Sequence, residues 1–193
     1  LAGASASLEA PHAAFRVDLK DAPPPMRVGF TGSLSEGFDD VMWFGRGPHE
    51  SYLDRHASAR VGRFEGSIRE QTFPYVRPQE NGNKFETRWM ALKRAPTTSV
   101  ASCAGLLLAA KAPSKTLGMQ CHRFQLEDFD GGADRKEQKF KHAGELKPSL
   151  ETSFCIDAAQ MGVGGIDSWG QRPLPQHMLQ SSKDEAWSFQ LRP

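Results

Sequence analysis

The sequence predicts an all-β fold, a large antiparallel β-sandwich formed by a single domain over residues 1–193. Three observations favour it. Short segments alternate apolar and polar residues with the period of two typical of half-buried strands. Prolines and glycines separate these segments, and no segment sustains the 3.6-residue period of an amphipathic helix. A sandwich is favoured over a barrel, and no repeat or change in composition marks a second domain.

The first half of the chain contains five predicted strands. Four of them alternate apolar and polar residues: Phe15–Leu19, Met26–Thr31, Gly62–Arg69 and Lys84–Leu92. The last of these is expected to be one continuous strand with one solvated face. Val41–Phe44 is wholly apolar, which predicts a strand buried on both faces.

The second half contains four more predicted strands. Leu106–Pro113 and Leu117–Phe124 are predicted to be a pair of strands joined by residues 114–116. The polar segment Glu127–Lys141 is expected to be a surface loop that allows one helical turn. Glu151–Asp157 and Ala186–Leu191 alternate again and complete the fold.

Between the last two strands lies Met161–Gly170, which contains four of the eighteen glycines and a single large aromatic residue, Trp169. Glycine gives up side-chain packing to reach positive φ or to let another surface approach closely. The residues alone leave two interpretations open. Trp169 plugs the core beneath its own turn, the commoner fate of tryptophan, or it stays exposed and stacks on a ring-shaped ligand.

Composition excludes several classes of partner. With 24% charged residues and a net charge of +1, the chain shows no sign of binding nucleic acid or a membrane surface. The spacing of Cys103, Cys121 and Cys155 fits neither a zinc motif nor a disulfide framework, so buried thiols are predicted. The absence of an N-glycosylation acceptor points the same way, and we expect a cytoplasmic protein.

Candidate catalytic patterns are weak. In the loop Gly45–Arg55 the side chains of Arg46, Glu50, Asp54 and Arg55 are expected to neutralise one another. A glycosidase-like acid/base pair formed by Glu50 and Asp54 is the less favoured alternative. Ser168 lacks the glycine that a nucleophile elbow requires two residues earlier, where Ile166 stands.

Metal and cofactor sites are not predicted either. None of the six histidines has the spacing of a metal motif, and His142 is expected to hydrogen-bond Glu145 or a backbone carbonyl. We therefore predict no catalytic residue, no metal ligand and no cofactor in this chain.

Five segments in order nevertheless resemble one family. The segments are Trp43–Arg55, Pro74–Gly82, Arg88–Trp89, His142–Leu146 and Met161–Gly170. Together they are similar to the C-terminal domain (domain 5, the small-chain region) of the large bacterial-type β-galactosidases of glycoside hydrolase family 2. The resemblance extends from about Arg27 to Pro193. Leu53 in place of proline, Gly144 and Ile166 depart from the family pattern.

The resemblance implies a galactose mutarotase-like sandwich that is truncated at its N-terminus, because the family's domain has strands before the region matching Arg27. It implies that the two catalytic glutamates lie on a TIM barrel that this chain lacks. It also implies that Trp169 binds substrate by stacking on the sugar, chiefly its aglycone or an acceptor. Magnesium and sodium, held by other domains, and a homo-oligomer are expected of the parent enzyme.

The expected function is therefore that of a β-galactosidase component. The parent enzyme would hydrolyse terminal non-reducing β-D-galactose residues of lactose and related β-galactosides, in partnership with the TIM barrel. Two alternatives stay open: a free-standing carbohydrate-binding or mutarotase-like module, and an inert scaffold that supports oligomer packing.

Overall fold

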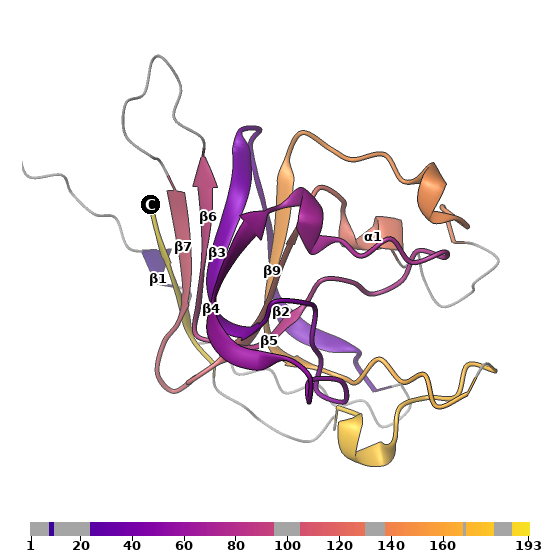
Figure 1. Cartoon of the computed structure of the whole chain (residues 1–193). Coiled ribbons are helices and arrows are strands. Elements are labelled where there is room, and N and C mark those ends of the chain that lie inside the picture. Colours follow the sequence, from indigo (N-terminus) through magenta and orange to yellow (C-terminus); the bar gives the residue numbers. More distant parts are fainter. Residues whose placement is uncertain (1–7, 10–23, 95–104, 130–137, 168, 180–186) are drawn as a thin grey trace, which may run out of the picture.

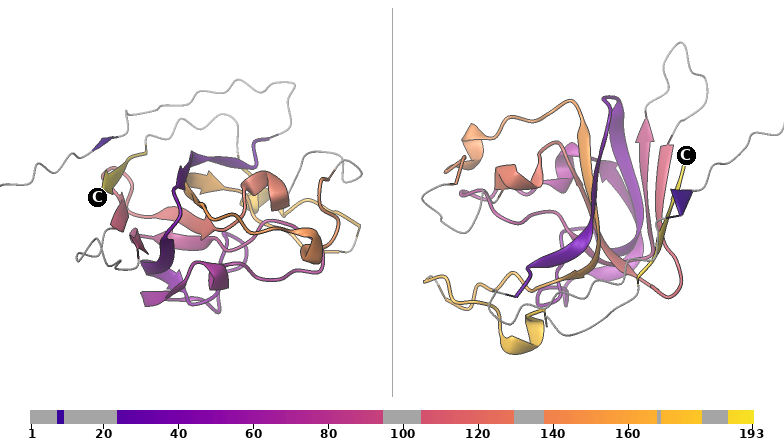
Figure 2. Two further views of the ribbon diagram at one scale, coloured as in Figure 1. Left: turned by 90° about the horizontal axis from the view of Figure 1, so that it is seen from above. Right: turned by 180° about the vertical axis from the view of Figure 1, so that it is seen from behind.

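A computed structural model describes residues 8–9, 24–94, 105–129, 138–167, 169–179 and 187–193. Two antiparallel sheets with very little helix make up this part of the chain (Figures 1 and 2), which confirms the all-β sandwich. Sheet A has the strand order β1-β10-β7-β6-β3-β4, and sheet B has the order β2-β9-β8-β5. The predicted strand Phe15–Leu19 lies outside the described residues.

The strands of sheet A are β1 (Leu8–Glu9), β3 (Phe38–Gly47), β4 (Arg60–Ser67), β6 (Trp89–Arg94), β7 (Gly105–Ala110) and β10 (Phe189–Arg192). Those of sheet B are β2 (Arg27–Leu34), β5 (Lys84–Thr87), β8 (Leu117–His122) and β9 (Thr152–Gln160). Helical structure is limited to α1 (Leu126–Phe129) and the 3₁₀ turns η1 (Arg69–Gln71), η2 (Ala143–Glu145) and η3 (Pro175–His177). The turn in α1 is the one that the polar segment after Leu126 was expected to allow.

The core lies between the two sheets, where alternate residues of each strand meet. In β3 the side chains of Val41 and Trp43 are buried, whereas Met42 and Phe44 on the opposite face are only half-buried. The prediction that this strand is buried on both faces is therefore wrong, because sheet B covers only one face of sheet A. Sheet B contributes Met119 and Ile156 to the same core, among others.

One predicted strand is in fact two. The segment predicted as a single strand over 84–92 ends its first half at Thr87, in sheet B, and resumes at Trp89, in sheet A. The register of β5 shifts between Lys84 and Thr87, and Glu86 has a positive φ of 53°. At the crossing, the N–H of Arg88 donates to the carbonyl of Phe44. Thr87 is the buried residue next to the break in the first half, whereas Met90 and Leu92 are buried in the second, so the buried face changes at the break, which the alternation of residue types did not reveal.

The strands β7 and β8 exist as predicted, but they are not partners. β7 pairs with β6 and β10 in sheet A, whereas β8 pairs with β5 and β9 in sheet B. The connection at residues 114–116 therefore passes from one sheet to the other instead of closing a hairpin. Crossings of this kind, here and at Arg88, are what tie the two sheets into one sandwich.

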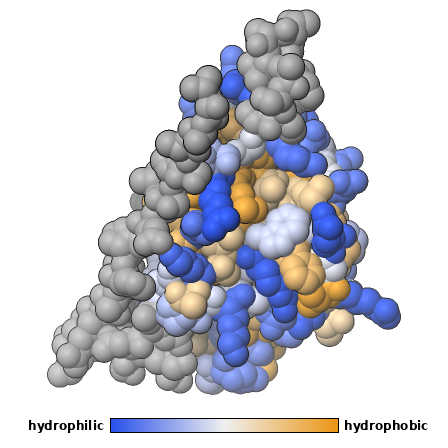
Figure 3. Space-filling view, turned by 90° about the vertical axis from the view of Figure 1, so that its left-hand side faces the viewer, coloured by the Kyte–Doolittle hydropathy of each residue, from blue (hydrophilic) through white to orange (hydrophobic). Residues whose placement is uncertain are grey.

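The two sides of the molecule differ. Loop segments 72–83 and 161–178 extend from the sandwich on the side away from β7 in Figure 1, together with α1 and η2. They carry exposed apolar side chains, namely Phe73, Val76, Ile166, Trp169 and Leu174. The side at which β7 lies instead shows a central apolar area surrounded by hydrophilic side chains (Figure 3).

Candidate functional site

The glycine loop, residues 161–170, is held at its base by a carboxylate from a distant part of the chain. Asp54 Oδ1 accepts a hydrogen bond from the N–H of Val163 at 3.0 Å, and Oδ2 accepts one from the N–H of Gly164 at 2.9 Å. Gly162 lies so close to this carboxylate that a Cβ there would overlap it. The prediction that arginines neutralise Asp54 is therefore wrong: both of its oxygens bind the backbone of the loop.

The glycines of the loop also take up conformations that other residues avoid. Gly164, Gly165 and Gly170 have φ values of 73°, 88° and 85°. At Gly165 a Cβ would meet nothing within 4 Å, so the backbone angle, not space, favours glycine there. The prediction that these glycines allow either a positive φ or a close approach is confirmed: Gly162 allows the close approach of Asp54, and Gly165 has a positive φ.

Trp169 is 93% exposed, so the interpretation that it plugs the core is wrong. Its backbone N–H donates to Asp167 Oδ1 at 2.9 Å, and the N–H of Gln171 donates to the same oxygen at 3.2 Å. These two bonds form a turn around the tryptophan. Its neighbour Ile166 is also 54% exposed. The indole ring is thus presented to its surroundings on a loop whose base and tip are each fixed by a carboxylate.

A second carboxylate, Glu50, joins two of the segments that carry the family resemblance. It forms an ion pair with Arg55, as predicted, and it accepts hydrogen bonds from the hydroxyl of Tyr75 and from the N–H of Gly82 at 2.7 Å. Burial and the hydrogen bond to Glu50 raise the pKa of Tyr75. Glu50 therefore holds the segment 74–82 against the loop that follows β3.

Arg46 is paired differently from the prediction. Its guanidinium contacts the carboxylate of Glu86 at 2.7 Å and donates to the carbonyl of Ala59 at 2.9 Å. Since Glu50 and Asp54 are both engaged with groups of the protein itself, the structure supports a structural role for them over an acid/base pair.

Beside the loop lies a partly buried ionic cluster that sequence reasoning missed. Arg27 of β2 contacts Glu80 at 3.0 Å and Asp157 of β9 at 3.2 Å. Burial raises the pKa of Asp157 to about 7, although the positive charge of Arg27 opposes the shift. Burial raises the pKa of Glu80 as well. In the sequence, Asp157 could have indicated this cluster, because it is the one charged residue in the buried part of β9.

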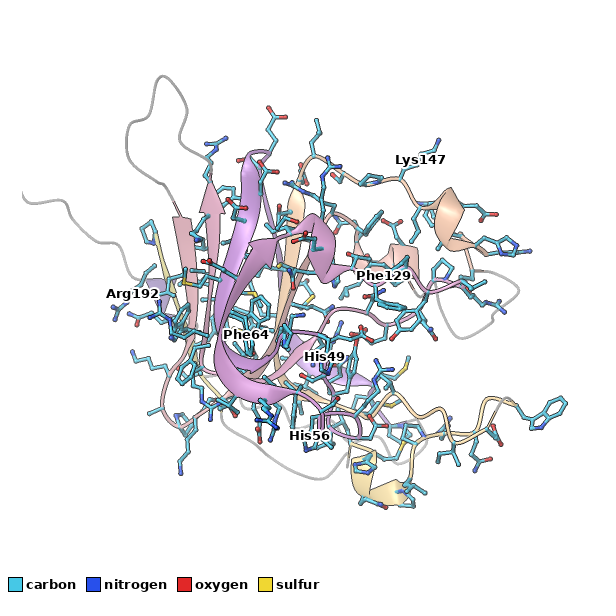
Figure 4. The ribbon with its side chains drawn as sticks, in the orientation of Figure 1. His49, His56, Phe64, Phe129, Lys147 and Arg192 are labelled. Carbon is cyan, nitrogen blue, oxygen red and sulfur yellow. The ribbon has the colours of Figure 1, made fainter. Side chains whose placement is uncertain are left out.

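The histidines described by the structure form hydrogen bonds with groups of the protein itself. His122 is fully buried between the hydroxyl of Thr72 and the carbonyl of Asn81, and burial lowers its pKa to about 4. His49 contacts Ser58 and His56 contacts the carbonyl of Tyr52, at the loop seen in Figure 4. The backbone N–H of His142 donates to Glu145 at 3.4 Å, while the hydrogen bond expected of its imidazole stays a prediction. Among the described residues no group of three His, Cys, Asp or Glu side chains is arranged to hold a metal ion.

Cys121 and Cys155 are buried free thiols, as predicted, and Cys103 lies outside the described residues. Within the described part of the chain, no helix has the length and apolar character needed to cross a membrane.

A cavity of about 760 Å³ opens between the glycine loop and the segment 75–80. Its floor is formed at the ends of β2 and β9 by Arg27, Glu80 and Gln160. Phe129 of α1 lines it on the side of the segment 75–80; its position on the loop side of the molecule is labelled in Figure 4. The glycine loop contributes its backbone on the opposite side, and Asp167 and Gly170 of the lining stand on either side of Trp169.

Fold and site together define an antiparallel β-sandwich domain that presents an exposed aromatic side chain on a braced glycine loop. The family model described as β-galactosidase small chain matches residues 7–192, so the chain belongs to the β-galactosidase small chain family.

Its relatives are β-galactosidases. The chain is 32% identical over 171 residues to the β-galactosidase of Priestia megaterium, and these residues make up 89% of this chain and 15% of the relative. It is 35% identical over 159 residues to the β-galactosidase of Vibrio cholerae, covering 82% of this chain and 13% of the relative. The β-galactosidase of Lactobacillus delbrueckii is 32% identical over 86% of the chain. The chain thus spans about one seventh of the length of the relatives it matches.

Proposed function

We propose that this chain is one component of a β-galactosidase that hydrolyses terminal non-reducing β-D-galactose residues of lactose and related β-galactosides. In this proposal the chain supplies Trp169 to the substrate pocket and is inactive alone. The two catalytic glutamates belong to a TIM barrel elsewhere in the protein. The observation that carries the proposal is the exposure of Trp169, 93%, on a loop whose base is fixed by Asp54.

The chemistry suits a sugar. A pyranose has an apolar face of C–H groups and a rim of hydroxyls, and the flat face of an indole covers the former without needing to satisfy the latter. Stacking would hold the aglycone or an acceptor, while the galactose enters the barrel. The two hydrogen bonds to Asp167 keep the backbone at Trp169 in one conformation, which lowers the entropy lost when the ring is covered.

The remaining features of the parent enzyme are expectations. We propose magnesium and sodium ions bound by its other domains, as the family resemblance implies. We also propose a homo-oligomer located in the cytoplasm.

The test is Trp169→Ala in the full-length protein that contains this chain. Loss of the stacked face should weaken binding at the glucose or acceptor position by roughly 1–3 kcal/mol. This corresponds to a rise of about 5- to 150-fold in the KM for lactose or for an acceptor alcohol. Unchanged kinetics with both would refute the role of Trp169. The free-standing alternative predicts instead that the 193-residue chain alone binds galactose saturably in a titration.

A further inference from the structure

The cavity beside the glycine loop has the size of a ligand site. Its volume of about 760 Å³ lies within the range of roughly 300–1,000 Å³ that is typical of small-molecule sites. The segment that carries Tyr75 and the loop 161–170 extend from the same side of the sandwich (Figure 1) and form its two walls. The cavity is separate from the exposed face of Trp169, which does not line it.

Hydrogen-bonding capacity is left unused at its floor. The carboxylate of Glu80 accepts a hydrogen bond from the amide of Gln160 and one from Arg27 at 3.0 Å. The amide oxygen of Gln160 is buried and has no hydrogen-bond partner among the described residues. Asp157, which is 1% exposed, lies behind Arg27, and its oxygens have only the ion pair at 3.2 Å. Buried polar atoms without partners are costly. The oxygen of Gln160 has almost no accessible surface, so a ligand hydroxyl would donate to it, and remove this cost, after the amide group turns toward the cavity.

The charges of the lining nearly cancel. Three arginines and three carboxylates surround the cavity, namely Arg27, Arg55, Arg172, Glu80, Glu127 and Asp167. Arg27 and Glu80 already neutralise each other, and Arg55 is paired with Glu50 outside the lining, which leaves one lining carboxylate in excess. A strongly anionic or cationic ligand would gain little net attraction from such a surface. Hydroxyl groups, which both donate and accept, match a lining of paired charges and amides.

One wall contains several glycines. Gly164 and Gly165 line the cavity, and at Gly165 nothing lies within 4 Å of the place of a Cβ, so a ligand can approach the backbone closely there. Asp167 and Gly170 also line it. Trp169 is thus flanked in the chain by two residues that line the cavity.

We propose that this cavity is a carbohydrate subsite that holds the far sugar of an oligosaccharide aglycone, so that the preferred substrate class is β-galactosides longer than a disaccharide. The inference rests on the proposed function of Trp169. Gln160 and Glu80 would bind hydroxyls of this sugar, and the glycine wall would pack against its ring.

The experiment compares three substrates in the full-length protein: a nitrophenyl β-galactoside, lactose, and the trisaccharide in which galactose is β-linked to lactose. In Gln160→Ala, kcat/KM for the trisaccharide should fall by roughly 3- to 10-fold, the effect of one net hydrogen bond. The other two substrates should be unaffected, because neither reaches the cavity. Gln79→Ala, at an exposed residue of the lining, should lower the trisaccharide value by about 2-fold with little risk to folding.

Gln176→Ala is the matched control, since Gln176 is exposed in η3 and does not line the cavity. Equal losses on all three substrates, or no loss on the trisaccharide in either lining variant, would overturn the subsite. Trp169→Ala separates this inference from the proposal beneath it. If that variant leaves lactose kinetics unchanged while Gln160→Ala selectively impairs the trisaccharide, the stacking role fails and the subsite stands.

Discussion

The bracing of the glycine loop by Asp54 can be tested without reference to catalysis. Asp54→Asn keeps the size and shape of the side chain but replaces one acceptor oxygen by an NH₂ group, which would face a backbone N–H. One of the bonds to Val163 and Gly164, at 3.0 and 2.9 Å, is therefore lost. A hydrogen bond to a charged acceptor contributes about 1.5–3 kcal/mol, and Asp54 is half-exposed, so we take the lower part of that range, about 1.5–2 kcal/mol.

This loss should appear as faster hydrogen exchange of the loop. A fall of about 1.5–2 kcal/mol in the free energy of local opening accelerates exchange by roughly 10- to 30-fold. The measurement is hydrogen–deuterium exchange of peptides covering residues 161–167 in the full-length protein. Asp40→Asn, at an exposed position of β3, serves as the control that leaves the loop unchanged. Exchange at Val163 and Gly164 that is the same in both variants would refute the bracing role of Asp54.

Three further predictions concern stability. Burial lowers the pKa of His122 from 6.5 to about 4, so between these pH values the unfolded chain binds a proton that the folded chain does not bind. The free energy of unfolding should therefore fall by up to about 3 kcal/mol as the pH is lowered from 6.5 to 4. Urea unfolding at several pH values measures this fall, which should be smaller in His122→Gln. Leu108→Ala, at a fully buried position, should cost about 2–5 kcal/mol in the same assay, whereas Leu107→Ala, on the half-buried outer face of β7, should cost clearly less. Gly162→Ala should accelerate exchange of the loop, since its Cβ would displace the Asp54 carboxylate; an unchanged exchange rate would contradict the close approach.

Sequence periodicity predicted most of the strands because each buries one face. Met26–Thr31 and Glu151–Asp157 were recognised by alternation and became β2 and β9, which pair along their whole length. This periodicity could not predict which sheet each strand belongs to. Alternation reports which face of a strand is apolar, but not which neighbour donates its hydrogen bonds, so the passage between sheets at Arg88 was invisible.

The site shows the same limit in sharper form. The sequence identified Met161–Gly170 as a glycine loop with one aromatic residue, yet the fate of Trp169 depends on what holds the loop. Its base is held by Asp54, more than a hundred residues earlier in the chain. Local charge balance suggested arginine partners for Asp54, since arginines are its neighbours in sequence. Every residue except proline has a backbone N–H, so the residue types alone could not show that the N–H groups of a distant loop bind Asp54.

The glycines of the loop therefore have two separable purposes within this chain. At Gly162 the demand is space, because the Asp54 carboxylate occupies the place of a side chain. At Gly165 the demand is a φ of 88°, with open space where a Cβ would lie. The first fixes the base of the loop, and the second turns the chain ahead of Trp169. A loop built only to be flexible would need neither a carboxylate at its base nor one at its tip. The combination instead describes a loop that presents one exposed aromatic ring in a defined position.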